Sequence, residues 1–209
     1  MIFVYSSAQI FFGSIAWLLS KFWFSVEVRG TENIRDAKGP LILVSNHKSL
    51  GDHFLILSSI PRFWKSPLVP IIIMTHDRYF EKFLTHIFFK MLGTYPAQRG
   101  VGYDVSLARP IEVLKEGGVV GIYPEGHTVP GNSLGDFKKG IGELIKRSAG
   151  VPIIPIAIHV PERLFLEIMP LPGARFSVRF GVPFYPESSR SSEDLTALVK
   201  ERIAALFYE

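Results

Sequence analysis

Short apolar runs alternate with helical patterns along most of the chain, and this alternation limits the fold more than any other feature of the sequence. Six runs have the length and the β-branched content of strands: residues 25–30, 41–46, 68–74, 118–123, 151–158 and 175–184. Alternating strands and helices are typical of α/β proteins, and 209 residues fill one core with little left for a second. We therefore predict a single α/β domain with a mixed β-sheet flanked by helices.

The first 20 residues carry no charged side chain. A helix of about 20 residues matches a hydrocarbon layer of ~30 Å, so this segment can span a membrane or lie in one. A cleaved signal peptide is the alternative, although the segment lacks a basic start and a cleavage motif. We predict a membrane-associated N-terminal helix at residues 1–24, followed by the α/β domain at residues 25–209.

Two other segments have the pattern of amphipathic helices. Residues 79–93 repeat apolar side chains with a 3.6-residue period, and Lys82, His86 and Lys90 share another face. We predict that this helix packs on the core, with a helix on the membrane surface as the alternative. Residues 187–207 predict a C-terminal helix with Ser191 or Ser192 as its N-cap.

The composition excludes several kinds of active site. The chain has no cysteine, which excludes a disulfide, a thiol nucleophile and a zinc site built on thiolates. The net charge of +4 comes from scattered basic residues, which fits an anionic membrane surface or phosphate ligands better than nucleic acid. Hydrophobic residues make up 47% of the chain and the mean hydropathy is +0.24, so we expect part of the apolar surface to meet lipid.

His47 and Asp52 stand five positions apart directly after an apolar run. On a straight helix their side chains would be rotated by ~140° and displaced by ~7.5 Å, so a regular helix cannot pair them. Ser45, Asn46 and Gly51 are suited to irregular backbone, and a bend there would turn Asp52 toward His47. The alternative is that Asp52 only caps the helix that follows.

Three further stretches place polar groups beside apolar segments. The stretch of residues 118–131 begins with an apolar strand that ends in Pro124, Glu125 and Gly126. By itself this pattern also fits a strand-end turn with an exposed carboxylate. Arg99 closes the turn at residues 93–100, and arginine suits a phosphate oxygen. Lys138 begins a predicted helix, whose N-terminal amides also favour an anion.

Taken together in their order along the chain, these stretches make the chain resemble the glycerolipid acyltransferase family, best known for the 1-acylglycerol-3-phosphate acyltransferases. The motif N-H-x-S-x-x-D is Asn46–Asp52, and the glycine-to-arginine block is Gly93–Arg99. The aromatic-Pro-Glu-Gly block is Tyr123–Gly126, followed at the usual distance by Phe137–Gly140, and the apolar strand with prolines is Val151–Ile156. The resemblance covers about residues 27–185. The family usually has an arginine two residues after the glycine of Pro-Glu-Gly, where this chain has Thr128.

The resemblance implies an acyltransferase domain at residues 25–209 that moves a fatty acyl group from a thioester to a lysophospholipid hydroxyl. His47 would be the general base, and Asp52 would orient its imidazole. The substrate-binding residues that it implies are Asn46, Ser49, Arg99, Glu125, Gly126 and Lys138. The expected donor is acyl-CoA or acyl carrier protein, and the expected acceptor is 1-acylglycerol-3-phosphate, giving phosphatidic acid. We expect no metal or other cofactor, no nucleic acid partner, and a membrane location with the site on the cytoplasmic side.

Several alternatives stay open at this point. The acceptor can be another lipid hydroxyl. The GNSLG motif at residues 131–135 allows a membrane-bound lipid hydrolase with Ser133 as nucleophile, although no strand runs directly into that serine. His47, Asp52 and His53 could be metal ligands, but no cysteine or second histidine cluster completes a set. Oxyanion donors are expected in the backbone of residues 47–52 or after Glu125.

Overall fold

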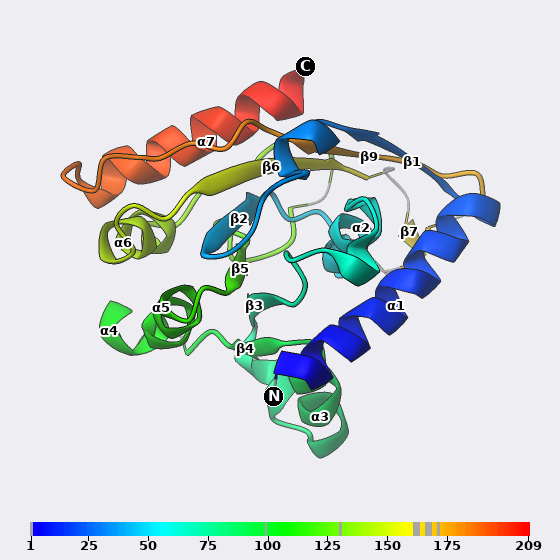
Figure 1. Cartoon of the computed structure of the whole chain (residues 1–209), viewed down its shortest axis with the longest axis horizontal. Helices are drawn as coiled ribbons and strands as arrows, with labels where there is room; N and C mark the ends of the chain where they lie inside the picture. The colour runs from blue at the N-terminus through cyan, green and yellow to red at the C-terminus, as the bar shows by residue number, and fades with distance from the viewer. Residues whose placement is uncertain (1, 99, 130, 161–163, 166–168, 171) are drawn as a thin grey trace.

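Within the part of the chain that the structure describes, seven strands form one mixed sheet in the order β1-β9-β6-β2-β5-β3-β4 (Figure 1). The computed structural model describes residues 2–98, 100–129, 131–160, 164–165, 169–170 and 172–209. The strands are β1 (Ser25–Arg29), β2 (Leu41–Ser45), β3 (Ile71–Thr75), β4 (Thr94–Pro96), β5 (Val119–Ile122), β6 (Ile153–His159) and β9 (Arg175–Phe180), and β7 (Leu164–Phe165) pairs separately with β8 (Met169–Pro170). Neighbours in the large sheet are parallel except β6 and β9, so the predicted mixed sheet is confirmed.

Each of the six predicted strand segments overlaps a strand of this sheet, but β4 was not predicted. It has three residues, lies at the sheet edge and pairs only with β3, so its sequence carries little strand signal of its own. Its extended backbone depends on the neighbouring strand, which a short window of sequence cannot reveal.

Helices cover both faces of the sheet (Figure 1). Successive side chains of β2 alternate between them: Leu41 and Leu43 enter one core, and Ile42 and Val44 enter the other. Burial on both faces explains why the central strands are continuously apolar. The helices are α1 (Ile2–Phe22), α2 (Asp52–Ser59), α3 (Phe83–Met91), α4 (Tyr103–Ser106), α5 (Ala108–Lys115), α6 (Gly140–Arg147) and α7 (Ser192–Tyr208), with 3₁₀ turns η1 (Thr31–Ile34), η2 (Phe63–Lys65) and η3 (Asp77–Phe80).

The N-terminal helix α1 packs beside α2 and is fastened to the sheet by Gln9. This side chain is fully buried: its Nε2 donates to the carbonyls of Ile71 (2.7 Å) and Leu92 (2.8 Å), and its Oε1 accepts from the Ile71 amide (2.9 Å). The other face of α1 is apolar and exposed, with Phe22 at 85%. Among the described residues, no helix has both the length and the hydropathy that crossing a bilayer requires.

The helix α3 is present, but the prediction that it packs on the core is wrong. No residue of α3 is buried, and Phe83 and Leu84 are each 78% exposed. It connects β3 to the edge strand β4 and meets α1 instead, where the rings of Phe88 and Phe12 lie 5.4 Å apart. The sequence pattern gave the apolar face correctly but not its neighbour.

The C-terminal helix α7 begins as predicted. The Ser191 hydroxyl accepts a hydrogen bond from the amide of Asp194 at 3.0 Å, so Ser191 is the N-cap. Leu195, Val199 and Ile203 of this helix are completely buried in the second core.

Candidate active site

Two of the sequence motifs meet at the carboxyl ends of two central strands of the sheet. Because β2 and β5 are parallel neighbours, their carboxyl ends lie side by side, and the residues after them come together. The backbone amide of His47 donates to Glu125 Oε2 at 2.6 Å, although 78 residues separate them.

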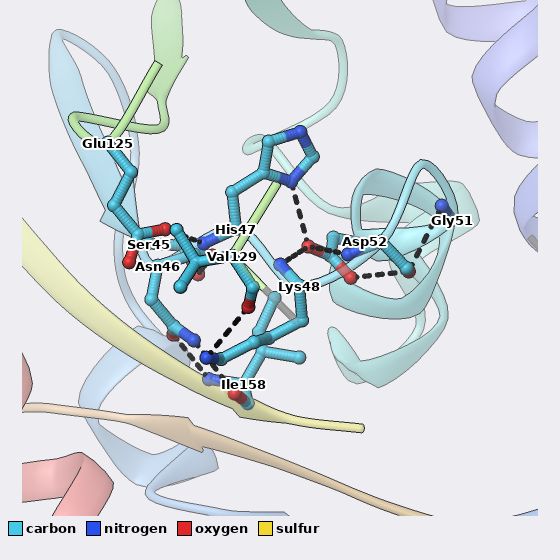
Figure 2. A network of polar contacts seen from close by, with 10 residues as sticks. Ser45, Asn46, His47, Lys48, Gly51, Asp52, Glu125, Val129 and Ile158 are labelled. Carbon is cyan, nitrogen blue, oxygen red and sulfur yellow. Dashed lines mark hydrogen bonds and ion pairs between the residues drawn. The ribbon is translucent and has the colours of Figure 1, made fainter. Parts of the chain in front are cut away.

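The bend after β2 brings His47 to Asp52 (Figure 2). Residues 46–49 have no regular structure, and α2 begins only at Asp52. The imidazole Nδ1 lies 2.9 Å from Asp52 Oδ2. The predicted bend and the predicted contact between the two side chains are therefore confirmed.

The Asp52 carboxylate is completely buried and held by several donors. Its Oδ2 also accepts from the amides of Lys48 (2.6 Å) and Ser49 (3.0 Å), and its Oδ1 accepts from the Ser49 hydroxyl (2.7 Å). The residue before α2 is Gly51, and no side chain caps this helix. The alternative that Asp52 only caps a helix is therefore wrong, because its oxygens face the preceding bend and His47.

The imidazole of His47 is fixed on two sides. A carboxylate only accepts, so Nδ1 donates its proton to Asp52 and Nε2 keeps a lone pair on the far side of the ring (Figure 2). The ring stacks on Tyr123, with centroids 4.3 Å apart and an angle of 20° between the planes. Burial, and then the charge of Asp52, raise the pKa of Tyr123 well above its ordinary value. The side chain of His47 keeps 18% exposure, so the ring is not sealed from solvent.

Asn46 and Ser49 use their polar atoms on the protein itself. The Asn46 side chain donates to the Ile158 carbonyl (2.9 Å) and accepts from the Ile158 amide (2.7 Å), so it extends the pairing of β2 with β6 in the manner of a peptide group. Ser49 donates to Asp52 and accepts from the amide of Gly51 at 3.2 Å. These contacts shape the motif, and the substrate contacts expected of both residues stay predictions.

The Pro-Glu-Gly block is packed under the side chain of Lys138. Glu125 is completely buried, and its second oxygen accepts from the amide of Gly135 at 2.8 Å. Gly126 has φ +69°, and a Cβ there would lie 2.8 Å from Lys138 Nζ, so this amine lies directly against Gly126. Arg99, the other predicted cation, lies outside the described residues.

The residues of the two alternative sites, the hydrolase serine Ser133 and the metal ligand His53, are not arranged as those sites require. The strand β5 ends at Ile122 and a loop separates it from Ser133, so the strand-to-serine elbow of a hydrolase is not formed. Both ring nitrogens of His53 are buried, and burial lowers the pKa of His53 to about 4. In the described part of the chain, no group of three histidine or acidic side chains is arranged to hold a metal.

Sequence reasoning gave no role to Lys48 and Tyr123, which both contact the motif residues. Lys48 occupies a variable position of the motif, and burial lowers its pKa while Glu125 and Asp52 oppose that shift. Tyr123 was noticed only as the aromatic residue of its block. A signal was available for both, because Lys48 lies between His47 and Ser49, and Tyr123 belongs to the same sequence block as Glu125.

The fold and the site define an α/β protein with an oriented His-Asp pair at the carboxyl edge of its parallel strands. The chain belongs to the acyltransferase family: the sequence model of that family, described as Acyltransferase, matches residues 25–159. The family prediction drawn from the motifs is therefore confirmed.

Individual relatives cover different shares of the chain. The chloroplastic 1-acyl-sn-glycerol-3-phosphate acyltransferase BAT2 of Brassica napus is 28% identical over an alignment of 155 residues that covers 67% of this chain and 41% of that protein. The 1-acyl-sn-glycerol-3-phosphate acyltransferase of Pseudomonas aeruginosa is 29% identical over 133 residues, which is 63% of this chain and 48% of that protein. The chain thus spans less than half the length of both relatives.

The fold also matches a solved structure. The crystal structure of the 1-acyl-sn-glycerophosphate acyltransferase PlsC from Thermotoga maritima superposes with a TM-score of 0.73 at 22% identity, covering 98% of this chain and 78% of that one. This likeness supports the single α/β architecture.

Proposed function

We propose that this protein transfers a fatty acyl group from acyl-CoA or acyl carrier protein to 1-acylglycerol-3-phosphate, giving phosphatidic acid. The observation that carries the proposal is the buried Asp52 carboxylate that orients His47 beside the Pro-Glu-Gly block. Membership of the acyltransferase family supports the reaction, and the names of the Brassica napus and Pseudomonas aeruginosa relatives support the acceptor.

The first step activates the acceptor hydroxyl. An alcohol is a weak nucleophile at neutral pH, so Nε2 of His47 removes its proton as the oxygen attacks the thioester carbonyl. Asp52 keeps the proton on Nδ1 and stabilises the imidazolium that forms. The face of Tyr123 restricts rotation of the ring and adds attraction to its positive charge.

The second step releases the thiol. The C–S bond of the tetrahedral intermediate breaks, the ester remains on the acceptor, and the proton on His47 passes to the thiolate. A thiol with a pKa near ~8.5 leaves readily, so no acyl-enzyme is required. The amides of residues 47–49 already donate to the two buried carboxylates, so we place the oxyanion donors after Gly126 and not in the bend.

The acceptor phosphate needs cations near the Pro-Glu-Gly block. We propose Lys138 and Arg99 for this role, since Lys138 lies against Gly126 and Thr128 stands two residues after this glycine, where the family usually has an arginine. The carboxylate of Glu125 accepts from two backbone amides, those of His47 and Gly135. It therefore joins the His-Asp motif to the loop that follows the Pro-Glu-Gly block. Each of its oxygens accepts one of these bonds and has a second lone pair, so a glycerol hydroxyl that donates to Glu125 would not have to replace either contact.

We also propose that the protein works at a lipid surface, with its site facing the cytoplasm, where thioester donors are made. The α1–α3 face consists of exposed apolar side chains on two touching helices: Phe11, Ile15, Leu18, Phe22, Phe83, Leu84, Ile87 and Met91. Exposed Lys21, Lys82 and Lys90 are suited to anionic head groups. Each large apolar side chain that enters lipid stabilises the bound state by about 1.5–3 kcal/mol, so this face fits a helix pair lying in the interface.

Acyl transfer with purified protein tests the reaction. We expect transfer from acyl-CoA or acyl carrier protein to lysophosphatidic acid, loss of transfer in His47→Ala with an unchanged circular dichroism spectrum, and little change in Ser133→Ala. Turnover at the wild-type rate in His47→Ala would end the mechanism. Ester hydrolysis that disappears in Ser133→Ala would instead support a hydrolase.

Acceptor kinetics test the phosphate assignment. Arg99→Ala and Lys138→Ala should raise KM for lysophosphatidic acid with a smaller effect on kcat, and should leave an uncharged monoacylglycerol unaffected. Lys139→Ala is the matched control, because the neighbouring Lys139 is exposed and pairs with Glu193 at 2.5 Å. Equal loss on both acceptors would mean that the two cations support the structure, and a preference for monoacylglycerol would point to another lipid hydroxyl.

A further inference from the structure

Lys48 connects three distant parts of the chain beside the His-Asp pair. The residue is only 4% exposed. Its Nζ donates to the carbonyl of Val129 at 3.0 Å and to the carbonyl of Ser133 (Figure 2 shows the bond to Val129). The same amine lies 5.0 Å from the ring centroid of Phe207, in the last turn of α7. One side chain therefore joins the motif, the loop after Pro-Glu-Gly and the C-terminal helix.

The Val129 loop, residues 127–129 and 131–135, is tied to the site by further bonds. The Val129 amide donates to the carbonyl of His47 at 2.8 Å, and the Gly135 amide donates to Glu125 at 2.8 Å. Lys48 adds the donor for two carbonyls between these points. Without it, both carbonyls lose a partner, and the middle of the loop loses its attachment to the catalytic segment.

Burying the amine of Lys48 costs free energy. Desolvation penalises it, and the nearby charges of Asp52 and Glu125, the two carbonyls and the face of Phe207 only compensate. An apolar side chain of similar length would be easier to bury. Lys48 therefore contributes by holding the carbonyls of Val129 and Ser133 in place, and not by adding net stability.

We propose that Lys48 is a positioning residue that fixes the Val129 loop against His47 and thereby sets the affinity for the acyl acceptor. The proposal rests on the acyl transfer proposed above, because the loop continues directly from the Pro-Glu-Gly block. Phe207 extends this arrangement to α7: its ring stacks on His159 with centroids 4.0 Å apart, and its carbonyl accepts from His159 Nε2 at 2.7 Å. The end of the C-terminal helix thus supports the acceptor side of the site.

Two measurements on Lys48→Met test this proposal. The first is hydrogen-deuterium exchange of peptides from the Val129 loop, which needs no substrate, and we expect exchange about tenfold faster than in the wild type. The second is the initial rate across lysophosphatidic acid concentrations, where KM should rise about tenfold while kcat changes less. Lys48→Arg should recover part of both effects because it restores a donor. Lys146→Met, the same change at an exposed site, should alter neither.

The outcomes separate this proposal from the proposed function. Unchanged loop exchange in Lys48→Met, or faster exchange with KM unchanged, would overturn the positioning role. If no variant and not even the wild type acylates a lipid, the proposed function fails, while the exchange data still decide whether Lys48 holds the loop. If Lys48→Met does not fold, Phe207→Leu removes the aromatic ring over Lys48 and its stacking on His159 but keeps both carbonyl bonds of Lys48, and it should produce the same changes on a smaller scale.

Discussion

His53 makes the stability of this protein sensitive to acid. Both nitrogens of its imidazole are buried and without a hydrogen-bond partner among the described residues, beside Leu43 and Ile56. Burial lowers the pKa of His53 to about 4, against about 6.5 in an unfolded chain. Between these values the unfolded chain binds a proton that the folded chain rejects, so the free energy of unfolding falls as the pH falls. The contribution is complete above pH ~6.5, and about 2 kcal/mol of it is lost by pH ~5.

Urea unfolding followed by circular dichroism at pH 7 and pH 5 measures this effect. His53→Leu removes the titrating group and leaves an apolar side chain among mostly apolar neighbours, so it should remain folded. We expect the wild type to lose about 2 kcal/mol more than His53→Leu between the two pH values. His86→Gln changes an exposed histidine and should behave like the wild type. Equal losses in the wild type and in His53→Leu would refute the reasoning, because the acid sensitivity would then come from other groups.

Three further predictions concern the site, the N-terminal helix and the lipid surface. Asp52→Asn should lower kcat by about two to four orders of magnitude, because an amide cannot fix the required imidazole tautomer, and a rate near that of the wild type would contradict the His-Asp role. Gln9→Leu should lower the free energy of unfolding by about 2–3 kcal/mol in urea titrations, since three buried bonds to backbone groups are lost; an unchanged midpoint would show that α1 is held by packing alone. Replacing Phe83 and Leu84 together by serine should weaken sedimentation with anionic vesicles about tenfold or more without changing stability, because both are exposed; equal binding would exclude α3 from the lipid contact.

Much of the site could be predicted because its determinants are local. Helix geometry forbids a contact between His47 and Asp52 on a regular helix, so the motif required a bend, and the structure has one. Continuous apolar runs located the central strands that are buried on both faces, and the N-cap of α7 followed from its residue type. The order of the motifs identified the family.

Only the tertiary structure decided which distant groups meet. The amide of Asn46 is matched by Ile158, 112 residues away, and Lys48 reaches Ser133, 85 residues away, because β2 lies between β5 and β6 in the sheet. No local pattern encodes that order. The exposure of α3 has the same origin, since an amphipathic period gives the apolar face of a helix but not what lies opposite it. The sequence by itself therefore determined the residue types of the site and its local backbone. The strand order determined which distant residues contact one another, because burial depends on how the elements pack and not on any one segment.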